Sequence, residues 1–266
     1  MKDSEKVNLT PYDPTTDFIP QEFYQSVIPI IKNSGNYPEN IIGTGFLIQY
    51  NGVSYIVSAK HVVESEDNPS MFFTGKGSTP IILGTDTFRG FGLDWISHPR
   101  GLDVAVMPLI LPTSISQKII NNKIIQNKTI DPATIKPNVR TKHLGYGGKM
   151  TGVYKRTQKL SGTPGAAFGR YVIGNMDEIT IKSPARFGDS GSPLFVKFEQ
   201  KSRILVGVVT RTGTRVKITN VEDGEYTGET KAIPIQHVLD IINSKSTQEK
   251  IKNANKKIND MTPKWD

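Results

Sequence analysis

Apolar positions along this chain fall in short runs that are separated by Gly, Pro, Asn and Ser. Such runs, rich in Val and Ile and bounded by turn residues, are typical of strands in an all-β protein. In the clearest case, apolar runs at residues 43–48 and 55–63 flank Asn51-Gly52, a dipeptide that is the strongest short signal for a β-hairpin. Further strands are predicted at residues 142–146, 153–160, 170–173, 178–181, 193–198, 204–210 and 230–233.

The two ends of the chain follow other patterns. Residues 234–244 carry apolar side chains at helical spacing, with Pro234 at the first turn, and this predicts a helix. Residues 245–266 are rich in Lys and Asn and are expected to continue as a helix that frays into a tail. Residues 1–22 are polar and contain three prolines, which indicates a surface extension.

These patterns divide the chain into five segments. Its 266 residues suffice for one large domain or two small ones. The segments are an N-terminal extension at 1–22, a first β-rich unit at 23–111, a polar connection at 112–137, a second β-rich unit at 138–233, and a C-terminal helix with a basic tail at 234–266.

Composition narrows the class of protein. The chain contains no cysteine, which fits a reducing compartment. Its first residues lack the apolar core of a signal peptide, and no stretch approaches the roughly 18 apolar residues of a membrane span. We therefore expect a soluble cytoplasmic protein without a membrane partner.

The chain is basic, with a formal net charge of +8. Residues 132–176 hold eight Lys or Arg and no acidic residue, so a basic face could attract nucleic acid or an acidic protein. Interspersed positive charge that keeps strand surfaces soluble is the favoured explanation, because basic motifs interleaved with aromatic residues are missing. The sequence thus disfavours nucleic acid as a partner. It also predicts no metal or cofactor, since no His, Asp or Glu cluster has ligand spacing.

One serine has the context of a nucleophile. Ser190 lies in Gly-Asp-Ser-Gly-Ser-Pro at residues 188–193, where glycines permit backbone N–H groups to converge. Such a serine needs a nearby base and an acid. Of four histidines, His61 directly follows a predicted strand, and Asp103 opens the apolar run 103–109, where a buried acid needs a partner. Alone, each of the three residues also fits an ordinary turn, strand or cap, and Asp94 is a competing acid.

Together these residues resemble the chymotrypsin-type (trypsin-like) serine peptidase family. The matching pieces are Ser-Ala-Lys-His at 58–61, Leu-Asp-Val-Ala-Val at 102–106 and the serine motif, in the order His, Asp, Ser with spacings of 42 and 87 residues. The resemblance implies an all-β fold of two six-stranded antiparallel β-barrels with a C-terminal helix. His61 and Asp103 would belong to the first barrel, and Ser190 to the second.

The resemblance also implies roles for individual residues. Ser190 would attack the carbonyl, His61 would be the base, and Asp103 would hold the imidazole. Backbone N–H groups of Gly188 and Ser190 would form the oxyanion hole, and the Thr210 hydroxyl would contact the aspartate. The substrate pocket would be uncharged and would prefer small to medium apolar side chains; its lining residues would be Pro184, Ala185, Thr210, Thr212 and Gly213.

Asp189 is a departure from relatives that are activated by cleavage. In those relatives a new Ile or Val N-terminus is buried against this acid. Here Ile41-Ile42-Gly43-Thr44 resembles such a terminus but lies so close to His61 that we expect it inside a strand. We therefore predict no activating cleavage and a Lys or Arg partner for Asp189.

The expected function is that of a serine endopeptidase working through an acyl-enzyme, inside the cell and on a limited set of protein targets. Its partners would be a protein or peptide substrate and a possible regulatory protein. The alternative is a catalytically silent peptidase-fold module that binds peptide or nucleic acid. The sequence leaves the oligomeric state open.

Overall fold

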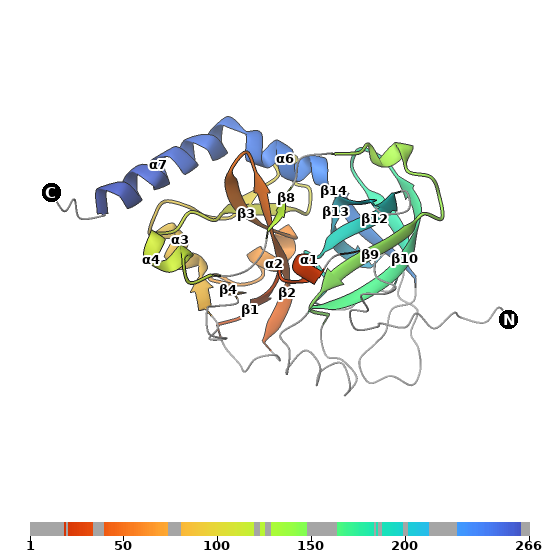
Figure 1. The fold of residues 1–266 in the computed structure, drawn as a ribbon, viewed down its shortest axis with the longest axis horizontal. Coiled ribbons are helices and arrows are strands. Elements are labelled where there is room, and N and C mark those ends of the chain that lie inside the picture. The colour runs from red at the N-terminus through yellow and green to blue at the C-terminus, as the bar shows by residue number, and fades with distance from the viewer. Residues whose placement is uncertain are drawn as a thin grey trace.

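The computed structural model describes residues 19, 21–33, 40–73, 81–119, 123–125, 129–147, 164–183, 185, 188–198, 202–212 and 228–261. Its β-strands form two sheets that lie side by side, and two consecutive helices end the described chain (Figure 1). None of the helices in these ranges is long and apolar enough to cross a membrane. The predicted strand at 153–160 lies outside the described residues.

The first sheet contains eight strands. Its path runs β5-β4-β1-β2-β3-β7-β6, and β8 pairs with β2 in parallel. The bounds are β1 Val27–Ile31, β2 Ile41–Tyr50, β3 Val53–Ser58, β4 Ser70–Phe73, β5 Ile81–Gly84, β6 Ile96–Ser97, β7 Ala105–Pro108 and β8 Ile124–Ile125. The predicted hairpin joins β2 to β3, and the positive φ angles of Asn51 (47°) and Gly52 (78°) suit the tight turn.

The second sheet is a closed barrel of six strands in the order β10-β11-β14-β13-β12-β9. The bounds are β9 Arg140–Gly145, β10 Gly165–Gly174, β11 Ile179–Lys182, β12 Pro193–Phe198, β13 Ser202–Thr212 and β14 Glu229–Pro234. The expected all-β class with two barrel-like halves is confirmed. The halves differ in detail, because the described strands of the first sheet follow an open path rather than a closed ring of six.

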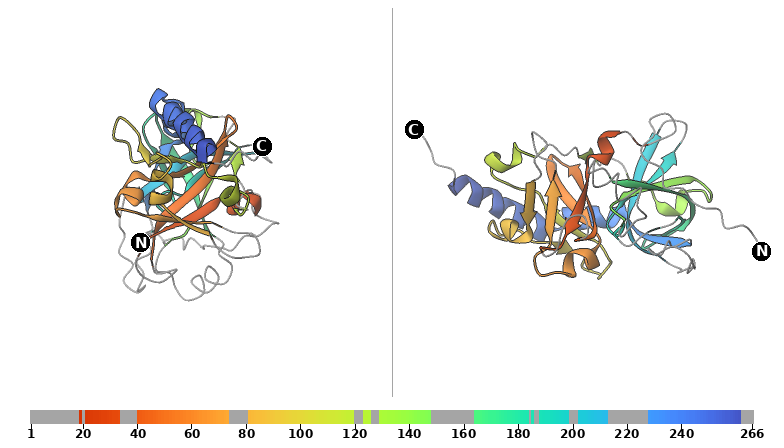
Figure 2. Two further views of the ribbon diagram at one scale, coloured as in Figure 1. Left: turned by 90° about the vertical axis from the view of Figure 1, so that its left-hand side faces the viewer. Right: turned by 90° about the horizontal axis from the view of Figure 1, so that it is seen from below.

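Helices are few and mostly short. They are α1 Gln21–Tyr24, α2 Lys60–Glu64, α3 Thr85–Arg89, α4 Thr113–Ser116, the 3-10 turn Pro132–Thr134, α6 Ile235–Asn243 and α7 Lys245–Met261. Helix α6 follows Pro234 as predicted, and buries most of its apolar face. Helix α7 is longer than a fraying end would be, and in Figures 1 and 2 it extends along the first sheet away from the barrel.

The largest hydrophobic cluster joins the two halves. It contains Phe46 and Val57 from the first sheet, Leu144 and Phe195 from the barrel, and Val238 from α6. All five side chains are buried. Burial of apolar surface contributes roughly 25 cal/mol per Å², so a shared core strongly opposes separation of the halves.

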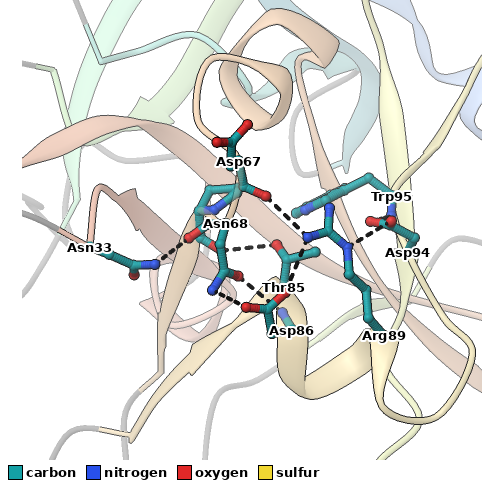
Figure 3. Close-up of polar contacts among 9 residues, drawn as sticks. Asn33, Asp67, Asn68, Thr85, Asp86, Arg89, Asp94 and Trp95 are labelled. Atoms are coloured by element: carbon teal, nitrogen blue, oxygen red, sulfur yellow. Dashed lines mark hydrogen bonds and ion pairs between the residues drawn. The ribbon is translucent and has the colours of Figure 1, made fainter.

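A polar network holds the loop that follows α2 (Figure 3). Arg89 donates from Nη1 to the carbonyl of Asp67 and to Asp86 Oδ1, each at 3.1 Å, and from Nε to Asp94 Oδ2 at 2.9 Å. Asn68 closes the network through its Nδ2, 2.6 Å from Asp86 Oδ2. Single exposed ion pairs contribute little, but several that share one guanidinium restrain a loop together.

Candidate catalytic site

The serine motif forms a tight turn between the halves. Gly188 has φ = 100° and Gly191 has φ = 91°, values that disfavour any residue with a Cβ. A Cβ at Gly191 would also overlap the Thr44 carbonyl and the Ser58 hydroxyl. Both glycines of the motif are therefore required by backbone geometry, and Ser190 lies between them.

Thr44 on β2 fastens this turn to the first sheet. Its N–H donates to the carbonyl of Ser190 at 2.8 Å, and its hydroxyl donates to the carbonyl of Gly188 at 2.7 Å. The same hydroxyl accepts from the N–H of Tyr146 at 2.9 Å, so it links three segments. Sequence reasoning did not select Thr44, although its position between Gly43 and Gly45 was a usable signal.

His61 and Asp103 are joined at two points. The His61 N–H donates to Asp103 Oδ1 at 2.9 Å, and His61 Nδ1 lies 2.8 Å from Asp103 Oδ2. A carboxylate at Nδ1 keeps the proton there and leaves Nε2 free to act as a base. The histidine side chain is 51% exposed. Its helix packs closely on β2, since a Cβ at Gly43 would overlap Val62.

Ser190 makes a different contact. Its hydroxyl donates to the carbonyl of Thr210 at 3.0 Å. Among the hydrogen bonds of the described residues, none joins Ser190 to His61, so the structure brings the predicted base and acid together and leaves the hydroxyl turned toward β13. The expected contact between the Thr210 hydroxyl and Asp103 stays a prediction; the contact described for that hydroxyl is its donation to the carbonyl of Lys231 at 3.4 Å.

The oxyanion and pocket residues are placed only in part. Gly188 and Ser190 lie in one tight turn, and the role of their N–H groups as an oxyanion hole stays a prediction. Ala185 and Thr210 are buried, and Thr212 belongs to β13. Pro184 and Gly213 lie outside the described residues. The shape and preference of the pocket therefore stay predictions.

Asp189 is buried, and one of its contacts is with a histidine. His143 on β9 is 1% exposed, and its Nε2 lies 3.6 Å from Asp189 Oδ2. The Lys or Arg partner stays a prediction; sequence reasoning did not select His143, because β9 is distant in sequence from the serine motif. Gly145 provides space for the carboxylate, since a Cβ there would lie 2.6 Å from Asp189 Oδ1.

The Ile41-Ile42 segment lies inside a strand, as predicted. Ile41 pairs with Ile31, and Gly43 pairs with Ile30, in the antiparallel ladder of β1 and β2. Both isoleucines at 41 and 42 are buried. The absence of an activating cleavage stays a prediction, which this burial supports.

Comparisons with known proteins identify solved structures that resemble this fold. A scan of protein-family models and a search of curated proteins find no match. Among solved structures, the human heparin binding protein is similar over 85% of this chain and 92% of its own, with a TM-score of 0.55 and 12% identity. An HtrA-type protease variant, AlgW with a tripeptide, matches 84% of this chain at a TM-score of 0.50 and 14% identity, and this chain spans 60% of that one. The MamO protease domain from Magnetospirillum magneticum, in its apo form, has a TM-score of 0.49 at 15% identity and covers 84% of this chain and 99% of its own.

At such identities a structural likeness establishes the fold alone. The chain has the chymotrypsin-like double-barrel fold, which it shares with the human heparin binding protein. What the fold does must be argued from the site, because one fold supports several functions.

Proposed function

We propose that this protein is a serine endopeptidase that uses Ser190, His61 and Asp103. The observation that carries the proposal is the two-point hydrogen bond between His61 and Asp103. An exposed histidine whose ring and backbone are both fixed by one carboxylate is oriented for proton transfer rather than for packing. The likeness of the fold to an HtrA-type protease supports the same conclusion.

The reaction follows from these groups. The Ser190 hydroxyl turns from the Thr210 carbonyl to His61 Nε2, loses its proton there and attacks the substrate carbonyl. The N–H groups of Gly188 and Ser190 bind the resulting oxyanion. His61 then protonates the leaving amine, and water releases the acyl group from Ser190 by the reverse sequence. Asp103 stabilises the charged imidazole during both halves.

Asp189 and Thr44 support this chemistry without contacting substrate. Thr44 holds both carbonyls that flank the reactive turn, and the Asp189 side chain lies below it against His143. Donors fixed before the reaction need no reorganisation in the transition state, which is the main advantage of an oxyanion hole. We infer that the turn is fixed by these internal contacts rather than by a newly cut N-terminus.

A fluorophosphonate probe tests the proposal, because it forms a covalent bond only with an activated serine. The wild-type chain and a Ser246→Ala control, changed at an exposed serine of α7, should gain the mass of one probe, and Ser190→Ala should gain none. Equal labelling of Ser190→Ala, or no labelling of the wild type, would contradict the proposal.

A silent peptidase-fold module is the second candidate. It is favoured by the Ser190 hydroxyl, which is bonded to Thr210 rather than to His61. In that case the wild type would resist the probe but bind peptides, and Ser190→Ala would bind them equally well. Fluorescence anisotropy with a labelled peptide library separates the two candidates.

A further inference from the structure

A second group of titratable side chains lies away from the proposed catalytic site. His98, His237 and Asp240 each offer one ligand atom, and these atoms lie within 4.8 Å of one another. His98 belongs to the turn between β6 and β7, whereas His237 and Asp240 lie three residues apart on α6, on one face of the helix. The chain thus brings three ligands of two types found in transition-metal sites, two imidazoles and one carboxylate, to one point.

His237 is oriented as a metal-bound histidine would be. Its Nε2–H donates to the carbonyl of Met176 at 2.6 Å, which places the lone pair on Nδ1. That Nδ1 is buried and has no hydrogen-bond partner, yet it lies 3.4 Å from Asp240 Oδ2. Two lone pairs face each other there, an arrangement that a cation between them would stabilise. The spacing is close to the edge of about 3.3 Å that tetrahedral Zn²⁺ bonds imply.

Asp240 is held in the same way. Its Oδ1 accepts a hydrogen bond from Gln236 Nε2 at 3.0 Å, which leaves Oδ2 to face His237. Outer partners of this kind orient the ligands of metal sites and raise their affinity. Met176 and Gln236 therefore already provide the outer shell of a site.

His98 completes the set. Its ring lies edge-on to the His237 ring with centroids 4.8 Å apart, and the residue is buried. Coordination through Nε2 places the ring proton on Nδ1, and the long 3.3 Å contact from the Arg100 N–H is then given up.

The local charge suits a dication. Asp177 and Asp240 are the carboxylates that face His237, at 3.6 and 3.4 Å. Arg100 pairs with Asp177 and neutralises that carboxylate. Asp240 is then the carboxylate left to balance the charge of a cation at His237.

We propose that His98, His237 and Asp240 bind one Zn²⁺, with water as the fourth ligand. Two imidazoles and one carboxylate favour Zn²⁺ over Ca²⁺ or Mg²⁺, which prefer oxygen ligands. The metal would tie the loop that leads to Asp103 to α6, a helix that packs on β7 of the first sheet and on β13 of the barrel. No local pattern indicated this site, since His98 and His237 are far apart in the chain.

Calorimetric titration of the full chain with zinc chloride, after chelator treatment and without a histidine tag, tests the site. The wild type should bind one Zn²⁺, and bound Co²⁺ should show the intense visible absorption of a tetrahedral site. Asp240→Asn should weaken binding about tenfold or more, since even outer partners contribute 10–100-fold. Asp240 is exposed, so this variant should fold; Asp260→Asn, exposed on α7, is the matched control.

Zinc should also raise the melting temperature of the wild type and of Asp260→Asn but not that of Asp240→Asn. No zinc binding by the wild type would overturn the proposal. Equal binding by Asp240→Asn would overturn it as well. Probe labelling at Ser190 is a separate measurement, so either proposal can fail alone.

Discussion

His143 Nε2 lies 3.6 Å from Asp189 Oδ2, and both side chains are buried beneath the turn that carries Ser190. Burial of a carboxylate is costly unless a polar or charged partner lies close to it. This contact connects β9 of the barrel to the serine motif. It thereby links the stability of the barrel to the geometry of the proposed nucleophile.

His143→Leu should destabilise the fold by about 2–4 kcal/mol, because it removes a partner from a buried acid. Urea denaturation measures this change. In a double-mutant cycle with Asp189→Asn, the two substitutions should couple by about 1 kcal/mol or more. Additive effects would show that the two side chains do not interact.

Asp103→Asn should reduce the rate of probe labelling at Ser190 by about 10⁴-fold while the fold is retained. An amide at this position keeps the geometry but stabilises the wrong histidine tautomer, an effect of that size in serine peptidases. Mass spectrometry of samples quenched at successive times measures the labelling rate, and circular dichroism checks the fold. Asp94→Asn is the matched control, since Asp94 bonds to Arg89 rather than to His61; a comparable loss there would argue against the assignment of Asp103.

Thr44→Val should lower the free energy of unfolding by about 1–3 kcal/mol and slow labelling of Ser190. The isosteric change leaves the Tyr146 N–H and the Gly188 carbonyl without their hydroxyl partner in a fully buried place. Chemical denaturation and probe kinetics report the two effects. Thr113→Val, at an exposed position of α4, should change neither the stability nor the labelling rate. A wild-type labelling rate in Thr44→Val would show that Thr44 does not influence the reactivity of Ser190.

Stability should fall steeply at alkaline pH because of Tyr171. Burial, with a smaller effect of Asp131, raises the pKa of Tyr171 to about 12. The folded state holds this proton more tightly than the unfolded state, so the stabilisation is complete below pH 10 and is lost as pH rises toward 12. The loss should be about 2–3 kcal/mol.

Denaturation curves between pH 9 and 12 measure this loss, with Tyr171→Phe as the comparison. The variant also lacks the hydrogen bond to the Pro132 carbonyl, so its absolute stability is lower. The slope with pH is the relevant quantity. Parallel slopes for the two proteins would contradict the assignment to Tyr171.

The sequence by itself determined the local features of this protein. Asn51-Gly52 specified a hairpin because both residues tolerate positive φ, and the run after Pro234 specified α6 through its helical period. The same holds for the glycines around Ser190, whose conformations follow from the motif. Each of these features depends on residues that are neighbours in the chain.

Only the tertiary structure decided which distant residues meet. Thr44 contacts Gly188, which is 144 positions away in the chain, and His143 approaches Asp189 from another strand. The ring of His98 contacts the ring of His237, which lies on α6. The spacing of apolar residues along the chain does not specify these contacts, because they depend on how the two sheets pack and on the register of their strands. The hydrophobic pattern fixed what each segment becomes, and the shared core decided which side chains face one another.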